Sequence, residues 1–491
     1  MTEQTKNFLE LHPDYEATIG IEVHIQLNTE SKIFCACPNK FGCAPNTNLC
    51  PICSGHPGTL PVLNNRVVDS AIMLGLATNC TITQTTGFAR KHYMYPDLPK
   101  NYQITQDKDP ICRHGYMTID SAGGEKQIRL LRIHMEEDAG KNLHTSQGYS
   151  LVDLNRAGTP LLELVSEPDL SSPQEARDYL QNLRTLVRYL GISDGNMDEG
   201  SFRADINVSI KKKADTELGT RAELKNINSF KFVAQAIEYE LARQYELVAS
   251  GQKVVQETRQ WDSKAQKTIG MRSKAEAQDY RYFTEPDLPA LDIDDAWIER
   301  IRQALPELPR QKIKRFQDQY GLTAYEADNL TEEQWLADFF EAVVYADKCS
   351  SAARAKLASN LILRDVLGYL KEKKQNLAQT KLTPQGLAEL IKAIDAGTIN
   401  SKIAQEVFLE LMETGKSPSA IIKEKNLTQI EDPALLAPII ERIMANNQES
   451  VAKYKAGNTK LFMFFVGQAM KETQGKANPK VLQELIEKML K

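Results

Sequence analysis

Residues 19–27 read IGIEVHIQL and alternate between apolar residues and polar or small ones. A period of two residues is typical of a β-strand that has one face in a hydrophobic core. Glu22 and His24 then share the other, polar face. This segment predicts a sheet, and it also predicts that titratable groups gather on one side of it.

Similar patterns recur along the first half of the chain. Residues 131–136 leave His134 and Glu136 on one face of a second strand, with Glu137 following where that strand ends. Residues 206–210 and 222–224 flank a lysine-rich turn and predict a hairpin. The second strand of this hairpin carries Glu223.

Two amphipathic helices interrupt these strands. Ser172, followed by Pro173 and Glu175, is a typical helix start, and apolar residues then repeat every three or four positions up to residue 190. A second helix is predicted over residues 229–250. Strands mixed with such helices indicate an α+β domain built on an antiparallel sheet.

From residue 295 onward the pattern becomes almost wholly helical. Helices are predicted to begin at Thr331 and Thr383, with another over residues 353–370. Turn-forming residues near 415–418 and 432–433 look like a connection between two helical units. We therefore expect three domains, covering residues 1–296, 297–418 and 419–491.

Size and charge exclude several classes of protein. The 491 residues carry a formal net charge of -5, which argues against a generally basic nucleic-acid coat. No apolar run approaches the roughly 20 residues needed to cross a bilayer, and the N-terminus lacks signal character, so we expect a cytoplasmic protein. Residues 451–491 contain eight lysines against three glutamates, a local net charge of +5.

Five of the eight cysteines lie within residues 35–53, and four of them form two close pairs, Cys35 with Cys37 and Cys50 with Cys53. Such pairs can offer four thiolates to one tetrahedral zinc ion, in a closed site that is structural and not catalytic. The alternative is a set of free structural thiols. Small polar residues around the pairs favour zinc, and Cys43 between them is a fifth thiol that could replace a ligand.

A second group combines acids with imidazoles. It comprises Glu22, His24, His134, Glu136, Glu137 and Glu223, from three predicted strands that could meet on one sheet face. Several carboxylate oxygens with an imidazole suit Mg²⁺ or Mn²⁺, and Mg²⁺ sites usually accompany phosphates. The alternative is an ordinary solvated sheet face with surface ion pairs.

Other motifs are absent or ambiguous. The chain has no phosphate-binding P-loop and no serine-rich amidase motif, so an ATP site would need another solution and no hydrolytic nucleophile is visible. Two segments, residues 91–102 and 272–283, interleave basic and aromatic residues, including Tyr93, Tyr95 and Lys100. They could stack bases and hold phosphates, or could simply pack as loops.

Several long motifs resemble those of one known family. They are IGIEVH (19–24), CPIC (50–53), YPDLPKNYQI (95–104), DLNRAGTPLLE (153–163), MDEGSFRAD (197–205) and RAELKNIN (221–228). They resemble the GatB family, the B subunits of the aspartyl/glutamyl-tRNA(Asn/Gln) amidotransferases, and the resemblance runs the full length of the chain.

The resemblance implies a cradle domain related to the glutamine synthetase fold, then an all-α domain, then a small helical tail like that of the YqeY family. It implies a carbon–nitrogen ligase that uses ATP to phosphorylate the side-chain carboxylate of Glu-tRNA(Gln) or Asp-tRNA(Asn). Ammonia then displaces the phosphate. An amidase-like GatA subunit would supply this ammonia from glutamine, and a small GatC subunit would complete a heterotrimer. A non-catalytic tRNA-binding scaffold is the alternative function.

The resemblance also implies roles for individual residues. The structural Zn²⁺ ligands fall on Cys35, Cys37, Cys50 and Cys53. The Mg²⁺ ligands fall on Glu22, His24, Glu136, Glu137 and Glu223, of which Glu137 and Glu223 are the expected catalytic residues. Arg221 and Lys225, predicted beside Glu223, are candidates for contacts with the phosphates of ATP. The basic tail is expected to meet the tRNA backbone in a salt-sensitive manner.

Overall fold

The computed structural model describes residues 8–145, 147–271, 279–346, 351–425, 427, 430, 432–473 and 476–490. The chain divides into two compact units, Met1–Leu308 and Pro309–Lys491. In the part of the chain that is described, no helix is long and apolar enough to span a membrane.

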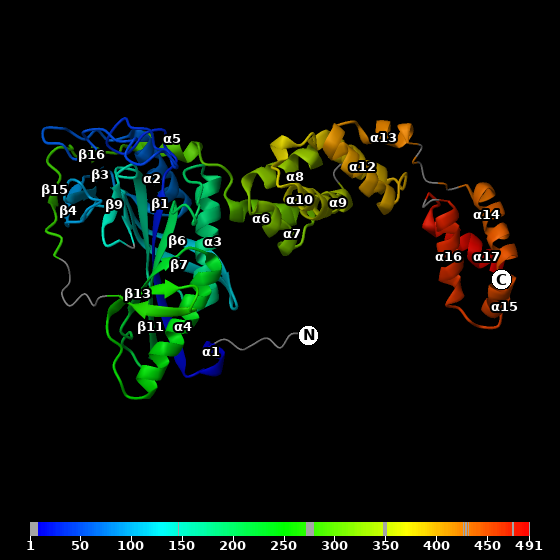
Figure 1. The fold of residues 1–491 in the computed structure, drawn as a ribbon, viewed down its shortest axis with the longest axis horizontal. Helices are drawn as coiled ribbons and strands as arrows, with labels where there is room; N and C mark the ends of the chain where they lie inside the picture. The colour runs from blue at the N-terminus through cyan, green and yellow to red at the C-terminus, as the bar shows by residue number, and fades with distance from the viewer. Residues whose placement is uncertain are drawn as a thin grey trace. The chain divides into compact units, whose positions relative to one another are not determined.

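The first unit is organised around a nine-stranded sheet in the order β14-β13-β12-β11-β1-β10-β7-β6-β2 (Figure 1). The predicted strand at residues 19–27 is its central strand, β1 (Tyr15–Gln26). The others are β2 (Thr81–Ile82), β6 (Cys112–Ser121), β7 (Gly124–Glu137), β10 (Pro160–Ser166), β11 (Phe202–Lys212), β12 (Ala222–Ile227), β13 (Glu257–Asp262) and β14 (Lys267–Gly270).

The expectation of an antiparallel sheet needs one correction. Neighbouring strands are antiparallel, and β11 and β12 form the predicted pair, but β12 and β13 run parallel. The reason is the connection between them. The 20-residue helix α4 (Phe230–Ala249) carries the chain back along the sheet, so the next strand starts from the same end as β12.

Two predicted helices, α3 (Pro173–Tyr189) and α4, pack side by side against the sheet (Figure 1). Their caps are as expected, because the side chain of Ser172 accepts from the Glu175 N–H and that of Ser229 from the Phe232 N–H. Apolar side chains of β1, α3 and α4 share one core. Since side chains alternate along β1, Glu22 and His24 point away from the face that carries Val23.

Shorter elements complete the first unit. They are the helices α1 (Phe8–Leu11), α2 (Asn65–Ala77) and α5 (Asp295–Gln303), the small sheet β15 (Phe283–Thr284), β4 (Ala89–His92) and β5 (Tyr102–Thr105), and the pairs β16 (Leu291–Asp292) with β3 (Thr85–Thr86) and β8 (Lys141–His144) with β9 (Ser150–Asp153). β5 packs against β7, beside the polar residues at the end of that strand.

The second unit is helical, as predicted. Its helices are α6 (Pro309–Tyr320), α7 (Ala324–Thr331), α8 (Gln334–Ala346), α9 (Ala352–Asn360), α10 (Leu367–Lys373), α11 (Pro384–Asp395), α12 (Ser401–Thr414), α13 (Pro418–Glu424), α14 (Pro433–Asn446), α15 (Gln448–Lys455), α16 (Leu461–Glu472) and α17 (Pro479–Leu490). A π-helical segment, Leu361–Val366, joins α9 to α10, and a short 3₁₀ helix, Leu377–Gln379, follows α10.

The prediction that Thr331 starts a helix is wrong. Thr331 is the last residue of α7, where its hydroxyl donates to the Ala327 carbonyl at 2.9 Å. The capping box belongs to Thr323 and Glu326, one helix earlier. Both threonines are followed within three residues by a glutamate, so both resemble a helix start. Thr331 is buried on the face of α7 that packs in the core, and it therefore does not act as a cap. The predicted cap at Thr383 is confirmed.

The described residues of the second unit form two hydrophobic cores. Ile421 and Ile422 of α13 belong to the first of these cores, and the other begins at Leu436 in α14. α13 therefore packs with the helices that precede it. The three-domain division with cuts after residues 296 and 418 stays a prediction.

Candidate functional site

Three neighbouring strands place titratable side chains in one row across the sheet. The register pairs His24 of β1 with Glu163 of β10, and Glu163 with His134 of β7. Both imidazole Nε2 atoms lie close to Glu163 Oε2, at 3.3 Å for His24 and 3.4 Å for His134. Glu136 lies two residues after His134 on β7. Its carboxylate is 3.7 Å from the Nε2 atom of His24 and 3.4 Å from the Nε2 atom of His134.

Three side chains of this row could hold a metal ion. One ligand atom each from His24, Glu136 and Glu163 lies within 4.8 Å of the others. One imidazole and two carboxylates suit Mn²⁺ and Mg²⁺, which favour oxygen ligands and leave positions open for water or phosphate. The donor set therefore fits a divalent cation.

The acids and imidazoles of this row shift one another's pKa values. Burial favours the protonated carboxyl of Glu163, yet the imidazoles of His134 and His24 outweigh it and hold the pKa of Glu163 well below its usual range. Burial also disfavours a charged His134, but Glu163 and Glu136 raise its pKa to about 9. The two carboxylates thus favour the protonated form of His134.

Glu22 belongs to the next row of the same face. It lies opposite Asp205 on β11, and the Asn207 side-chain amide donates to its Oε1 at 3.3 Å. Burial, followed by the negative charges of Glu163, Asp205 and Glu223, raises the pKa of Glu22. The neighbouring carboxylates therefore affect the pKa of Glu22, but Glu22 is not part of the group formed by His24, Glu136 and Glu163.

Glu223 lies further along the sheet, on β12. Its Oε2 accepts from the Thr258 hydroxyl at 2.7 Å, and its Oε1 pairs with Lys225 Nζ at 3.0 Å. Lys225 also pairs with Asp205. Arg221 is exposed directly before this strand. Lys225 therefore lies beside Glu223, where carboxylates engage its ammonium group.

Glu137 diverges from its neighbour Glu136 because successive side chains of a strand point in opposite directions. Its Oε1 accepts from Lys100 Nζ and from the backbone N–H of Ile104, at 2.9 Å for the latter. Glu136 instead accepts from the Thr105 hydroxyl at 3.2 Å. β5 therefore contacts both carboxylates and keeps them apart.

The basic and aromatic segments flank this site. Lys91 of β4 lies with its Nζ 4.8 Å from the ring centroid of Tyr280. Burial opposes its charge, but Glu136 contributes most to raising its pKa, which places the ammonium in the field of the carboxylates. Among the residues that the structure describes, no carboxylate lies within ion-pair distance of Lys91. Lys91 is thus available to an anionic ligand.

The rest of the basic and aromatic segments is partly ordered by its own contacts. The Arg90 guanidinium lies 4.2 Å from the Tyr102 ring centroid and pairs with Glu285. Tyr95 is 53% exposed. Arg272 and Lys274, which the sequence pattern included, lie outside the described residues.

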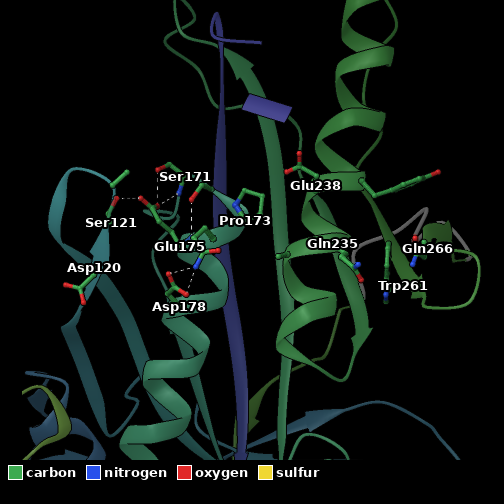
Figure 2. A pocket seen from close by; sticks show the side chains of 15 residues that line it. Asp120, Ser121, Ser171, Pro173, Glu175, Asp178, Gln235, Glu238, Trp261 and Gln266 are labelled. Carbon is green, nitrogen blue, oxygen red and sulfur yellow. Dashed lines mark hydrogen bonds between the residues drawn. The ribbon is translucent and has the colours of Figure 1, made fainter. Parts of the chain in front are cut away.

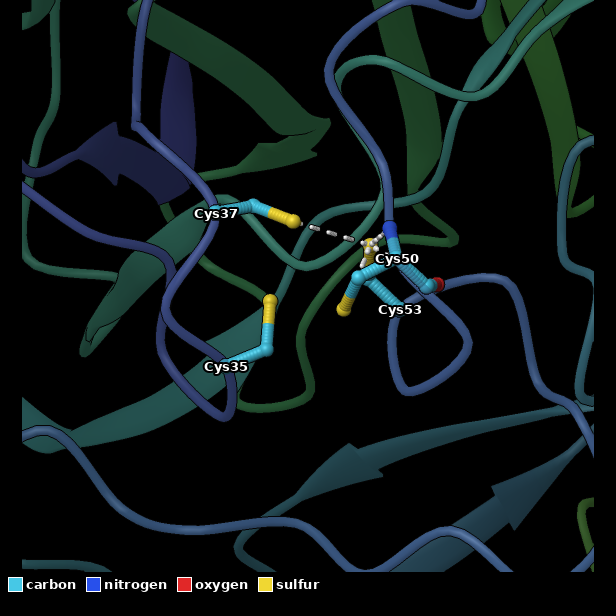
Figure 3. A group of neighbouring side chains, drawn as sticks. All are labelled: Cys35, Cys37, Cys50 and Cys53. Atoms are coloured by element: carbon cyan, nitrogen blue, oxygen red, sulfur yellow. Dashed lines mark hydrogen bonds between the residues drawn. The ribbon is translucent and has the colours of Figure 1, made fainter.

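The predicted thiol ligands lie in the segment that joins β1 to α2 in the sequence, and they come together in space (Figure 3). The sulfur atoms of Cys35, Cys37, Cys50 and Cys53 all lie within 4.8 Å of one another, and Cys43 is not part of the group. Cys53 Sγ is 4.0 Å from Cys37 Sγ and 3.9 Å from Cys50 Sγ. Four sulfurs bound to zinc at about 2.3 Å in a tetrahedron are separated by about 3.8 Å, so the group fits this ion.

A cavity of about 1100 Å³ lies elsewhere (Figure 2). It is lined by the start of α3, by α4 and by Trp261. Its acids are already engaged, since Glu175 accepts from Lys126 and Ser121, and Glu238 accepts from the Phe8 N–H. None of the predicted site residues lines this cavity.

Glu163 is the site residue that sequence reasoning missed as a ligand. It lies within the motif at residues 153–163, on a strand whose residues are nearly all buried and therefore show no alternation. A signal was present: Glu163 is the only charged residue between Pro160 and Ser166, and the strand is buried nearly throughout. A lone acid in such a run is expensive to bury without a partner or a metal.

Comparison with known proteins agrees with these features. A family model described as the GatB/GatE catalytic domain matches residues 17–299, and one described as the GatB domain matches residues 338–490. The B subunit of the aspartyl/glutamyl-tRNA(Asn/Gln) amidotransferase of Thermodesulfovibrio yellowstonii is 51% identical over 477 residues, covering 97% of this chain and 99% of that protein. The Myxococcus xanthus protein of the same name is 52% identical over 480 residues, with the same coverage. The chain therefore belongs to the GatB family.

Proposed function

We propose that this chain is the subunit of a tRNA-dependent amidotransferase that activates and amidates the aminoacyl group. The substrate is the side-chain carboxylate of Glu-tRNA(Gln), Asp-tRNA(Asn) or both. A carboxylate is a poor acyl donor because its leaving group would be oxide. Its oxygen therefore attacks the γ-phosphorus of ATP and ADP leaves. Ammonia then attacks the carbonyl carbon, and inorganic phosphate departs.

The observation that carries this proposal is the group of His24, Glu136 and Glu163 on one face of the sheet. Phosphoryl transfer needs positioning and charge neutralisation more than covalent help. When bound there, Mg²⁺ would neutralise charge on the β- and γ-phosphates. Glu22, one row away and with a raised pKa, is proposed to contact water around that ion. Glu223 holds Lys225 beside it.

Two basic residues on either side of the group have the right chemistry for the phosphates. Lys91 has a cation–π contact with Tyr280, and the charge of Glu136 raises its pKa. Lys225 pairs with Asp205 and Glu223 and would have to exchange one of these partners for a phosphate oxygen. We assign the more direct contact to Lys91, with Lys225 and the exposed Arg221 further out.

Glu137 is suited to a different step. Lys100 and the Ile104 N–H fix its Oε1, while no hydrogen bond from the described residues engages its Oε2. A carboxylate held in this way keeps one oxygen to accept a proton from the attacking ammonia. This role would make Glu137 catalytic without making it a metal ligand.

The four thiols are proposed to hold one structural zinc ion. Elemental analysis of the purified chain is then expected to give about one zinc per molecule. A folded protein free of zinc would contradict this assignment.

The remaining parts of the fold are assigned as follows. The first unit corresponds to a cradle related to the glutamine synthetase fold, and the last helices to a YqeY-like tail that contacts the tRNA backbone. An amidase-like GatA and a small GatC are the proposed partners, which accords with the lack of a visible hydrolytic nucleophile in this sequence.

A Glu137→Gln variant, assembled with its partner subunits, tests the proposal. Its tRNA affinity should be unchanged, while amide formation falls by on the order of 100-fold, since a positioned base typically contributes 10²–10⁴-fold. Glu125→Gln, exposed at the other end of β7, is the matched control. Full amidation by Glu137→Gln would contradict the role of Glu137 as the base, and the metal group alone would then distinguish catalysis from the alternative, a scaffold that only positions tRNA for a partner's catalysis.

A further inference from the structure

A buried lysine lies against the thiol cluster. Lys32 is only 1% exposed, which is rare for this residue type unless its charge is compensated. Its Nζ donates to the Asn48 carbonyl at 2.9 Å and to Cys53 Sγ at 3.6 Å. Its ammonium therefore has one neutral acceptor and one sulfur.

The backbone around Lys32 ties the same parts together. The Lys32 N–H donates to the Cys37 carbonyl, and the Ile33 N–H donates to the Gly158 carbonyl, both at 3.0 Å. Gly158 has φ +81°, and a Cβ there would lie 3.3 Å from Cys53 Cβ and 3.5 Å from Lys32 Cδ. The aliphatic part of the Lys32 side chain thus packs between the loop that carries the four cysteines and the segment of Gly158, which leads into β10.

The charge of the cluster explains why a cation is placed there. Four thiolates around one Zn²⁺ carry a net charge of -2, and burying uncompensated charge is costly. An ammonium in contact with one sulfur halves that excess. An N–H···S bond also fixes the orientation of Cys53 and draws electron density from its sulfur. Hydrogen bonds to metal ligands commonly orient and tune the ligands in this way.

We propose that Lys32 is a positioning residue of the zinc site, which hydrogen-bonds to the Cys53 thiolate and neutralises half of the excess charge. This inference rests on the proposed zinc ion but not on the amidotransferase activity. This role for Lys32 explains why the lysine is buried, although the proposed reaction assigns it no part.

The test compares Lys32→Met with Lys40→Met in the full-length, zinc-loaded chain. Methionine retains an unbranched, apolar side chain but has no N–H donor and no charge. Lys40 is exposed in the same loop, so its substitution removes the same charge without touching a thiol. Transfer of zinc to a chromogenic chelator should be faster by about 10-fold or more in Lys32→Met, the usual range for groups behind a ligand. Lys40→Met should match the unmodified chain.

Cobalt gives a second readout. In the Co²⁺-substituted chain, the sulfur-to-cobalt charge-transfer band should shift in Lys32→Met and stay in place in Lys40→Met. Equal release rates and identical bands in both variants would overturn the role of Lys32 while leaving the zinc site intact. An unmodified chain that binds no zinc would overturn both proposals.

A measurement on the unmodified chain covers the case in which Lys32→Met fails to fold. With ¹¹³Cd at the thiols and ¹⁵N-labelled lysine, ammonium protons of one lysine should show scalar coupling to the metal across the N–H···S bond. Absence of this coupling, with cadmium bound, would contradict the inference.

Discussion

The residue that best defines the site is Glu163. It is a buried carboxylate that two imidazoles approach within 3.4 Å, next to a second buried carboxylate, Glu136. Such an arrangement is unfavourable unless positive charge is supplied, either by protons on the imidazoles or by a cation. The burial of both carboxylates distinguishes this group from an ordinary surface ion pair.

Replacing Glu163 with Gln is expected to weaken Mn²⁺ binding by at least about 10-fold, because it removes an anionic ligand from the group. Titration of Mn²⁺ followed by electron paramagnetic resonance measures this directly. Glu125→Gln, which removes the same charge from an exposed position, should bind Mn²⁺ normally. Equal affinities in the two variants would show that Glu163 is not a ligand.

At the scale of single residues, the sequence located much of the site but not its centre. Alternation placed Glu22, His24, His134 and Glu136 on polar strand faces, and the spacing of the cysteines identified the thiol group. The strand of Glu163 is buried on both faces, so no alternation distinguished it. The availability of Lys91 depends on contacts between segments almost 200 residues apart, which local patterns do not contain.

At the scale of elements, the start of α3 provides a test that is independent of the metal. Glu175 accepts from the Ser171 N–H and from Lys126 Nζ, both at 2.8 Å. Burial raises its pKa, but the hydrogen bond from Lys126 and then that from Ser171 outweigh it, and the pKa is lowered. A carboxyl whose folded pKa is lowered stabilises the fold above its unfolded value and loses this contribution as pH falls through the folded pKa.

Glu175→Gln is therefore expected to destabilise the N-terminal end of α3 at pH 7 by about 1.5–3 kcal/mol, the usual range for a hydrogen bond to a charged group. The difference from the unmodified chain should shrink as the pH falls below about 4.5, where the unfolded carboxyl is protonated. Hydrogen exchange of the α3 amides, compared between the two chains at both pH values, measures it. A difference that persists unchanged at low pH would contradict the assigned cause.

Elements with local signals were predictable, and their pairing was not. A few adjacent residues are enough to predict the caps at Ser172 and Ser229 and the alternation in β1 and β11. The parallel pairing of β12 with β13 follows from α4 lying on the sheet, which is a tertiary choice. Thr331 and Thr323 carry similar cap signals, and only packing distinguishes them.

At the scale of the whole molecule, the cores indicate where the chain can be shortened. A chain that ends after Leu427 keeps Ile421 and Ile422 in their core, whereas one that ends after Pro418 loses them. We expect the longer chain to lose tRNA affinity by about 10-fold or more while its complex keeps full glutaminase activity. Its tRNA binding should also depend less steeply on salt, because phosphate contacts are lost. Filter binding at two salt concentrations measures both effects.

The shorter chain should in addition unfold more easily, since burying an isoleucine stabilises a core by about 1.5–3 kcal/mol. Thermal unfolding of the two truncated chains compares their stabilities. Unchanged tRNA affinity in both would remove the tail from the proposed interface, and equal stability would place α13 outside the core.

The proposed function depends above all on His24, Glu136 and Glu163 binding the divalent cation of an ATP-dependent reaction. Anomalous diffraction from crystals of the assembled complex, grown with Mn²⁺ and ADP, locates the bound metal ion directly. We predict an anomalous peak within about 2.5 Å of an atom from each of these three side chains, with phosphate oxygens completing the coordination. An ordered ADP whose Mn²⁺ peak lies away from all three side chains would contradict the assignment.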